Sequence, residues 1–340
     1  MTDLHIASDC TTKTEHLAQK NHVKKKVVIF SQIFPEFEEK LRQDFDVIKI
    51  NPKLGDVNQQ IREAVANAHG MIGAGRLLGK EQLDTAQHLE IVSSVSVGYD
   101  NYDVDYLKSR QIQLAHTPHV LTETTADTAF ALLMSAARRI PELDQWTRQG
   151  QWQRTVSAGQ FGMDIHGKTL GIIGLGHIGS AIARRGYYGF NMNIKYHGRR
   201  EKLETAQQFQ AEYLSLEELL TSSDFIVVAV DLNAQTKHLL GQAEFALMKS
   251  TAVLVNISRG AVIDEDALIE ALQNQQIFGA GLDVFTQEPL QSSKLFELNN
   301  VVVTPHIGSA TEATRYAMNK LAYENLVLAL NGQKPKYSVI

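Results

Sequence analysis

TLGIIGLGHIG, at residues 169–179, leads directly into the amphipathic stretch SAIARR at residues 180–185. An apolar run, three glycines spaced GxGxxG and a helical segment, in this order, are typical of the first strand, turn and helix of a sheet that binds a dinucleotide. The glycines alone would be a weak signal, but here a strand pattern and a helix pattern flank them. The sequence therefore predicts an α/β domain whose first strand lies at residues 169–173.

Each residue of the glycine turn has a predicted role in holding a dinucleotide. Gly174 permits the tight turn, Gly176 lets a pyrophosphate approach the backbone, and Gly179 lets the helix pack on the strand. His177 and Ile178 complete the turn, where free N–H groups at the helix N-terminus favour negative phosphates. The alternative is an ordinary glycine-rich turn between a strand and a helix.

The end of the second strand indicates which dinucleotide is bound. A site selective for NAD usually has an acidic residue there, which binds the ribose 2′-hydroxyl. This chain instead reads YHGRR at residues 196–200, with no acidic residue before Glu201. Because guanidinium groups match phosphate geometry, Arg199 and Arg200 predict a clamp for a 2′-phosphate, with NADP(H) preferred and NAD(H) as a second cofactor. The alternative is a solvated basic turn.

Two series of short apolar runs define the fold class. Most are apolar throughout, as strands buried on both faces are. The first series predicts four strands, at residues 27–30, 47–50, 71–74 and 91–95. The second predicts six, at residues 169–173, 193–196, 225–230, 253–257, 280–284 and 301–304. With helical segments between them, these runs predict an α/β protein with parallel, doubly wound sheets.

Two longer amphipathic stretches predict helices outside this alternation. Residues 121–140 place apolar side chains at steps of three and four, and Pro141 is expected to end this helix because proline has no N–H to donate. Residues 311–330 predict a C-terminal helix that returns to the first series of strands. Residues 1–26 are polar and lack an apolar period, which predicts a mobile N-terminal extension.

The last three predicted strands end in loops that carry reactive side chains, Arg259, Glu288 and His306. Because ligands bind outside the carboxyl ends of the strands in an open α/β sheet, these side chains are expected to meet in one site. An arginine can hold a substrate carboxylate, and a histidine can donate a proton as a hydride arrives. A glutamate can orient the imidazole and favour its protonated form. Taken singly, each residue has an ordinary structural explanation, but their joint placement predicts reduction of a keto acid.

The composition of the 340-residue chain limits the classes of protein to which it can belong. It is 44% apolar and 21% charged, with a formal net charge of −5 and a pI of about 6.2. A protein with this acidic balance is expected to bind neither nucleic acid nor a membrane surface. The single cysteine, Cys10, excludes an intramolecular disulfide. With no signal-peptide pattern, no membrane-spanning run and no metal-binding pattern, the sequence predicts a cytoplasmic protein without a metal.

Five motifs carry a resemblance to a known family. They are GIIGLGHIG at residues 171–179, NISRG at 256–260, AGLDVF at 280–285, QEP at 287–289 and PHIGSA at 305–310. From Val95 to Thr314 the chain resembles the D-isomer-specific 2-hydroxyacid dehydrogenase family, especially its glyoxylate/hydroxypyruvate reductase and 2-ketogluconate reductase branch. The resemblance implies reduction of a short 2-keto acid to a D-2-hydroxy acid, with His306 as the proton donor.

The resemblance also implies roles for residues outside these three loops. In the loop SVGYD at residues 96–100, the backbone N–H groups of Val97 and Gly98 are expected to hold the substrate carboxylate together with Arg259. Asp283 resembles an aspartate that contacts the nicotinamide amide. A homodimer built on the cofactor domains is implied as well.

The implied architecture is a pair of Rossmann-like domains. The NAD(P)-binding domain, residues 118–308, is expected to be inserted in a substrate domain made of residues 27–117 and 309–340. Two alternatives remain open. An NAD-linked phosphoglycerate or D-lactate dehydrogenase is disfavoured by the missing acid at His197. A dinucleotide-sensing, corepressor-like interaction protein would share the fold, although the acidic pI counts against it.

Overall fold

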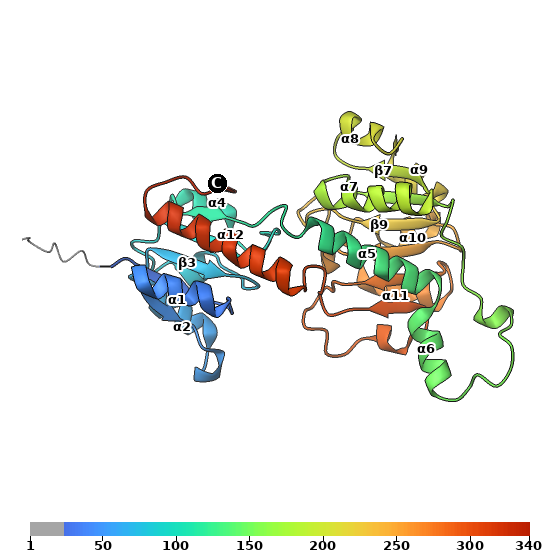
Figure 1. The fold of residues 1–340 in the computed structure, drawn as a ribbon, viewed down its shortest axis with the longest axis horizontal. Coiled ribbons are helices and arrows are strands. Elements are labelled where there is room, and N and C mark those ends of the chain that lie inside the picture. The colour runs from blue at the N-terminus through green and yellow to red at the C-terminus, as the bar shows by residue number, and fades with distance from the viewer. Residues whose placement is uncertain (1–23) are drawn as a thin grey trace, which may run out of the picture.

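A computed structural model describes residues 24–340 and shows two lobes, each built on a parallel sheet (Figure 1). Most of the predicted extension, residues 1–26, lies outside the described residues, as does Cys10. Its last residues belong to the fold: the first strand begins at Lys26, and the Lys25 ammonium group donates to Glu90 at 2.7 Å and to the Leu330 carbonyl at 2.8 Å. The predicted end of the extension is therefore wrong, because these contacts hold its last residues in place.

The first domain is a five-stranded parallel sheet in the order β2-β1-β3-β4-β5. Its strands are β1 (Lys26–Ile29), β2 (Asp46–Lys49), β3 (Gly70–Gly73), β4 (Ile91–Ser94) and β5 (Gln113–Ala115). Its helices are α1 (Pro35–Asp44), α2 (Val57–Val65), α3 (Lys80–Leu83) and α4 (Val104–Ser109). The four predicted strands are confirmed to within one residue at each end. The sequence does not predict β5, because a three-residue strand gives no apolar run.

The second domain is a seven-stranded parallel sheet in the order β12-β11-β10-β9-β6-β7-β8. Its strands are β6 (Thr169–Ile173), β7 (Asn193–His197), β8 (Glu212–Tyr213), β9 (Phe225–Val228), β10 (Val253–Asn256), β11 (Gly279–Leu282) and β12 (Val301–Val303). Counted from β6, this is the doubly wound order of dinucleotide-binding folds with one strand added. The six predicted strands are confirmed to within two residues. The exposed, two-residue edge strand β8 is not predicted.

Most helices of the second domain pack on the two faces of its sheet, while the helix at residues 140–148 has no buried residue and projects away from it (Figure 1). The helices of this domain are α5 (Thr122–Ala137), α6 (Ile140–Arg148), α7 (His177–Arg184), α8 (Leu203–Gln207), α9 (Leu216–Ser222), α10 (Gln242–Leu247) and α11 (Glu265–Gln273). The prediction that Pro141 ends a single long helix is wrong. The chain leaves α5 after Ala137 because Arg139 is left-handed, with a φ of 55°. Pro141 instead lies in the first turn of α6, where a missing N–H leaves no hydrogen bond unmade.

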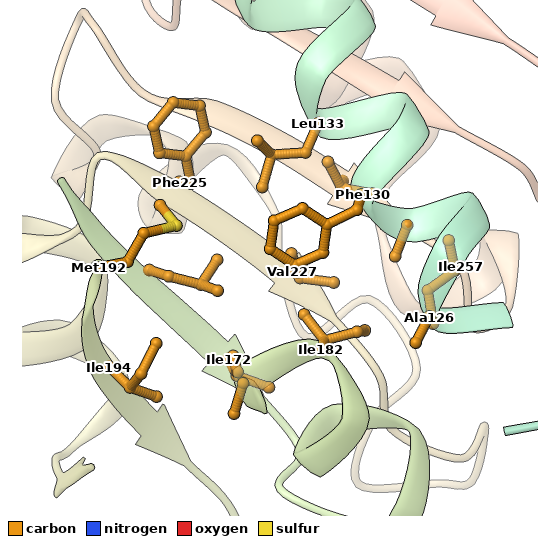
Figure 2. Packing of buried hydrophobic residues seen from close by; sticks show 14 of the residues in the cluster. Ala126, Phe130, Leu133, Ile172, Ile182, Met192, Ile194, Phe225, Val227 and Ile257 are labelled. Atoms are coloured by element: carbon orange, nitrogen blue, oxygen red, sulfur yellow. The ribbon is translucent and has the colours of Figure 1, made fainter. Parts of the chain in front are cut away.

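An apolar core fixes α5 against the sheet of the second domain (Figure 2). Phe130 and Leu133 of α5 face Ile172 of β6 and Val227 of β9, and both strand residues are fully buried. Phe130 also stacks on Phe190 with ring centroids 5.4 Å apart. Burying one such side chain completely stabilises a fold by roughly 1.5–3 kcal/mol. The core therefore holds rigid the strands whose carboxyl ends carry the candidate site.

The C-terminal helix α12 (Glu312–Leu330) follows the last strand of the second domain but packs on the first (Figure 1). The Ser93 hydroxyl of β4 donates to the Ala322 carbonyl at 2.8 Å, and Leu326 is fully buried. Thr124 of α5 and Thr314 of α12 share a hydrogen bond of 2.6 Å, so the outgoing and returning helices touch. The second domain is thus inserted in the first, as predicted.

Candidate active site

The glycine turn lies at the carboxyl end of β6, where the strand order of the sheet reverses. Gly174 has a φ of 102°, and a Cβ there would lie 2.5 Å from the Ala229 carbonyl oxygen, so the turn requires glycine. Gly179 packs so closely that a Cβ would lie 2.0 Å from the Gly174 carbonyl oxygen. Gly176 faces open space at the start of α7, whose first N–H groups have no side-chain cap. These residues fit a bound pyrophosphate.

The other two residues of the turn contact protein on one side. Ile178 packs against the cores of both domains. The His177 ring meets the His119 ring edge-on, with centroids 4.3 Å apart. Partial burial lowers the pKa of His177 below its ordinary 6.5, and the neighbouring His119 lowers it further. The His177 imidazole is therefore mainly neutral at pH 7 and brings no fixed charge to a phosphate.

The turn after β7 is held by the edge strand β8. The Tyr213 hydroxyl donates to the Gly198 carbonyl at 2.8 Å, and His197 Nδ1 donates to the Leu214 carbonyl at 3.0 Å. Arg199 and Arg200 are exposed, and within residues 24–340 neither forms a salt bridge or a side-chain hydrogen bond. An anchored backbone with two unpaired guanidinium groups fits a 2′-phosphate. The anchoring Tyr213 is not predicted from the sequence, because its strand is too short to recognise.

His306 and Glu288 form a hydrogen-bonded pair at the carboxyl ends of β11 and β12. His306 Nδ1 lies 2.7 Å from Glu288 Oε2, and the other carboxylate oxygen accepts from the Phe285 N–H at 3.0 Å. His306 has a left-handed φ of 52°, a conformation that non-glycine residues keep mainly where the surroundings enforce it. The predicted orientation of the imidazole by Glu288 is thus supported by a direct hydrogen bond between the two side chains.

The charge state of Glu288 determines which nitrogen of His306 carries a reactive proton. Burial alone would raise the pKa of Glu288, but hydrogen bonds from His306 and Phe285, with the nearby charges of His306 and Arg259, lower it below its ordinary 4.5. The carboxylate is therefore ionised at neutral pH and can only accept. His306 Nδ1 must be the donor in this pair, so Nε2 is left to face a substrate.

Asp283 supports the loop that carries His306. Its side chain is buried, and one oxygen accepts from the Thr304 hydroxyl and the Ile307 N–H, each at 2.7 Å. The second oxygen accepts from the Gly308 N–H at 2.7 Å. These three bonds surround His306 in sequence and fix its backbone. A carboxylate has about four acceptor sites, so one remains for the nicotinamide amide, and that role stays a prediction.

The predicted carboxylate loop follows β4 and rests on a chain of hydroxyl groups. The Ser96 hydroxyl donates to the Gly98 carbonyl at 2.6 Å. Ser96 therefore accepts from Ser94 at 2.6 Å, and Ser94 in turn accepts from the Tyr102 hydroxyl at 2.9 Å. Burial raises the pKa of Tyr102 to about 12, so this donor keeps its proton. This chain of hydrogen bonds thus fixes the backbone that presents the Val97 and Gly98 N–H groups.

Arg259 reaches from the second domain to this loop. Its backbone is set by buried Asn256 at the end of β10, whose amide donates to the Arg259 carbonyl at 3.0 Å. Its guanidinium Nε lies 3.0 Å from Asp100 Oδ1, and a Cβ on Gly98 would lie 1.8 Å from Nη2. The sequence offers no signal for the Asp100 contact, because the two residues are 159 positions apart.

The structure brings the predicted catalytic residues together. His306 and Glu288 are in contact, the charge of Arg259 acts on Glu288, and Arg259 lies over Gly98. The glycine turn and the basic turn lie at the carboxyl ends of neighbouring strands β6 and β7. The sequence misses Asp100, the hydroxyl chain beneath the loop, and the support of His306 by Asp283, since all of these depend on packing.

Comparisons with known proteins agree with this geometry. Residues 130–308 match the family model described as the NAD-binding domain of D-isomer-specific 2-hydroxyacid dehydrogenases. Over 318 residues the chain is 44% identical to the glyoxylate/hydroxypyruvate reductase B of Enterobacter sp. (strain 638), a match that covers 93% of this chain and 98% of that one. The chain belongs to the D-isomer-specific 2-hydroxyacid dehydrogenase family. It is therefore an NAD(P)-dependent oxidoreductase that acts on a CH–OH group.

Two solved structures show the same fold. A protein of Thermus thermophilus is 37% identical, with a TM-score of 0.84, and the match covers 93% of this chain and 100% of that one. An NADPH-dependent glyoxylate/hydroxypyruvate reductase from Sinorhizobium meliloti, in complex with NADP and malonate, is 34% identical, with a TM-score of 0.82. That match covers 93% of this chain and 97% of the other. The insertion of one Rossmann-like domain in another is thus shared with these proteins.

Other features of residues 24–340 lie apart from this site. None of the helices there combines the length and the apolar character that a membrane span needs, and no three His, Cys, Asp or Glu side chains gather as they would around a metal ion. Two open cavities are lined by residues far from His306. One, of about 570 Å³, includes His88 and Lys334 in the first domain, and one, of about 690 Å³, includes Arg139 and Phe278 in the second.

Proposed function

We propose that the protein reduces short 2-keto acids to D-2-hydroxy acids, with glyoxylate and hydroxypyruvate as main substrates and 2-ketogluconate as a longer one. NADPH is the preferred cofactor and NADH the second. The observation that carries the proposal is the pair of His306 and Glu288, 2.7 Å apart, beside an arginine that lies on the carboxylate loop. The reductase names and the NADPH dependence of the relatives support the substrate class and the cofactor.

The side chains divide the reaction between binding and proton transfer. A nicotinamide cofactor, when held by the glycine turn and the basic turn, would supply the hydride that the keto carbon receives. Arg259 and the Val97 and Gly98 N–H groups hold the carboxylate, and the arginine polarises the adjacent carbonyl. His306 Nε2 gives its proton to the carbonyl oxygen, which becomes the hydroxyl. The Glu288 carboxylate stabilises the imidazolium before transfer, and Asp283 keeps the loop in place.

A substrate panel tests this proposal directly. NADPH and NADH are each mixed with the enzyme and glyoxylate, hydroxypyruvate or 2-ketogluconate, and the loss of absorbance at about 340 nm is followed. We expect turnover of the first two keto acids with NADPH at higher kcat/KM than with NADH. Cofactor binding without turnover of any of the three would contradict the proposal and favour a sensor of dinucleotides.

The domain limits and the assembly are part of the same proposal. Because β1 begins at Lys26 and Lys25 is bonded to the first domain, we assign residues 25–117 and 309–340 to substrate binding and residues 118–308 to the cofactor. We propose a homodimer built on the second domain, where Trp152, Val156 and Phe161 follow α6 and are 62%, 47% and 58% exposed. Light scattering coupled to gel filtration should give twice the mass of the 37.8 kDa chain, and a monomer would contradict the dimer.

The cellular location is proposed as the cytoplasm. The single cysteine of the chain, typical of proteins from reducing compartments, supports it. Fractionation of cells that express the tagged chain should recover it with cytoplasmic markers, and recovery with secreted proteins would contradict the assignment.

A further inference from the structure

One ion pair joins the two domains at the predicted carboxylate site. Asp100 belongs to the loop after β4 in the first domain, and Arg259 to the loop after β10 in the second. Arg259 Nε lies 3.0 Å from Asp100 Oδ1 and 3.2 Å from Oδ2. The side chains are only 28% and 19% exposed, so solvent screens this pair less than an ordinary surface pair.

The contacts of Arg259 leave one edge of its guanidinium group for a ligand. Nε donates to Asp100, and Nη1 donates to the Ser258 carbonyl at 2.8 Å. Nη2 lies over Gly98, where a Cβ would approach it to 1.8 Å. The φ of Gly98 is not in the left-handed region, so glycine is needed here for close approach. Asp100 therefore holds the Arg259 guanidinium group at Nε. Nη2 of the same group lies over the Gly98 backbone, which is predicted to hold the substrate carboxylate.

We propose that Asp100 is a positioning residue for Arg259, which sets the direction of its free N–H donors and links the carboxylate clamp to the contact between the domains. The inference rests on the proposed function, because it assumes that Arg259 binds the substrate carboxylate. The base of Asp100 is itself held, since the hydroxyl chain from Tyr102 through Ser96 fixes the Gly98 carbonyl two residues earlier. The loop thus provides a firm support for the arginine.

Asp100 also has an effect that should weaken, and not strengthen, the binding of the substrate carboxylate. Its negative charge neutralises part of the Arg259 charge and repels a substrate carboxylate. If this repulsion dominated, removing the charge would tighten substrate binding. If positioning dominates, removing it loosens binding, because a flexible guanidinium group loses the fixed geometry of two parallel hydrogen bonds. The sign of the change in KM therefore decides between the two effects.

The test compares Asp100→Asn with Asp105→Asn, which makes the same charge change on the exposed face of α4. We expect Asp100→Asn to raise the KM for glyoxylate about tenfold, the loss of roughly one charge-assisted hydrogen bond. The inhibition constant of oxalate should rise in parallel, the KM for NADPH should stay unchanged, and the Tm should fall by no more than a few degrees, because only one ion pair is lost. Asp105→Asn should match the native enzyme in all four. A KM for glyoxylate that is unchanged or lower in Asp100→Asn overturns the inference.

The same change in an Arg259→Ala enzyme shows whether Asp100 acts through the arginine. If it does, Asp100→Asn should add no further loss there, because the residue that it positions is gone. An equal rise in KM in both backgrounds overturns the inference. If Arg259→Ala alone leaves kcat and KM unchanged, the proposed function of Arg259 fails. If Arg259→Ala is impaired and Asp100→Asn is not, only the positioning role fails.

Discussion

The proton-donating pair and the carboxylate clamp are built in different ways. His306, Glu288 and Asp283 all come from loops at the carboxyl ends of β11 and β12. His306 is hydrogen-bonded to Glu288 at 2.7 Å, and Asp283 accepts from the N–H groups of the next two residues of the His306 loop, each at 2.7 Å. The clamp instead needs Gly98 from the first domain and Arg259 from the second. The first group is complete within one domain, while the second exists only where the two domains meet.

This difference separates chemistry from substrate binding. A change in the proton-donating pair should lower kcat for any bound substrate, because the pair is assembled whether or not the domains are in contact. A change in the clamp should alter KM as well, because the clamp holds the substrate and depends on the approach of the domains. Four changes test this division.

The largest expected effect is on the proton donor. His306→Ala should lower kcat roughly a hundredfold or more, the usual scale of general acid catalysis, with little change in the KM for NADPH. His238→Ala is a matched control, since His238 is exposed and also left-handed, with a φ of 51°. Steady-state rates of glyoxylate reduction measure the effect. Near-normal turnover of His306→Ala would remove His306 from the mechanism.

The clamp should show a mixed effect. Arg259→Lys keeps the charge but loses the parallel pair of N–H donors, so the KM for glyoxylate should rise about tenfold and kcat should fall. Oxalate should compete with the keto acid and not with NADPH, and its inhibition constant should rise in the variant. Arg148→Lys, in an exposed helix ion pair, serves as the control. Unchanged kcat and KM in Arg259→Lys would contradict the role of Arg259 in the carboxylate clamp, and with it the proposed difference between the two regions.

The cofactor turn should be independent of both regions. Replacing Arg199 and Arg200 together by Ala should raise the KM for NADPH about tenfold, the loss of one charge-assisted contact, and leave the KM for NADH nearly unchanged. The preference of the native enzyme for NADPH should shrink as salt is added, because these arginines are exposed. Equal use of both cofactors by the native enzyme would show that neither arginine meets the phosphate.

The smallest effect is a shift along the pH axis. The pKa of Glu288 lies below 4.5, so its carboxylate is charged throughout the neutral range and favours the imidazolium form of His306. Glu288→Gln removes that charge and with it the support for the protonated form of the donor, so the alkaline, descending limb of the reductive pH–rate profile should move to lower pH. An unshifted limb would limit Glu288 to a structural role.

The predictions made from sequence succeed where the physical constraint is local. The strand before Gly174 and the helix after it follow from apolar patterns and from a turn that only glycine can make. Arg259, Glu288 and His306 are found because parallel strands all end at one edge of a sheet. Helix ends are harder: a left-handed residue, Arg139, ends α5, and the sequence pattern gives no sign of it.

What the sequence by itself determines here is therefore the pair of sheets, the glycine turn, the unusual basic turn after β7 and the three reactive side chains. Each of these depends on a few neighbouring residues. Tertiary structure alone decides the two short edge strands, the three hydrogen bonds that Asp283 accepts from the His306 loop, and the pairing of Asp100 with Arg259. The physical reason is distance along the chain: contacts between residues 17 to 159 positions apart exist only after the sheets have formed and the domains have met.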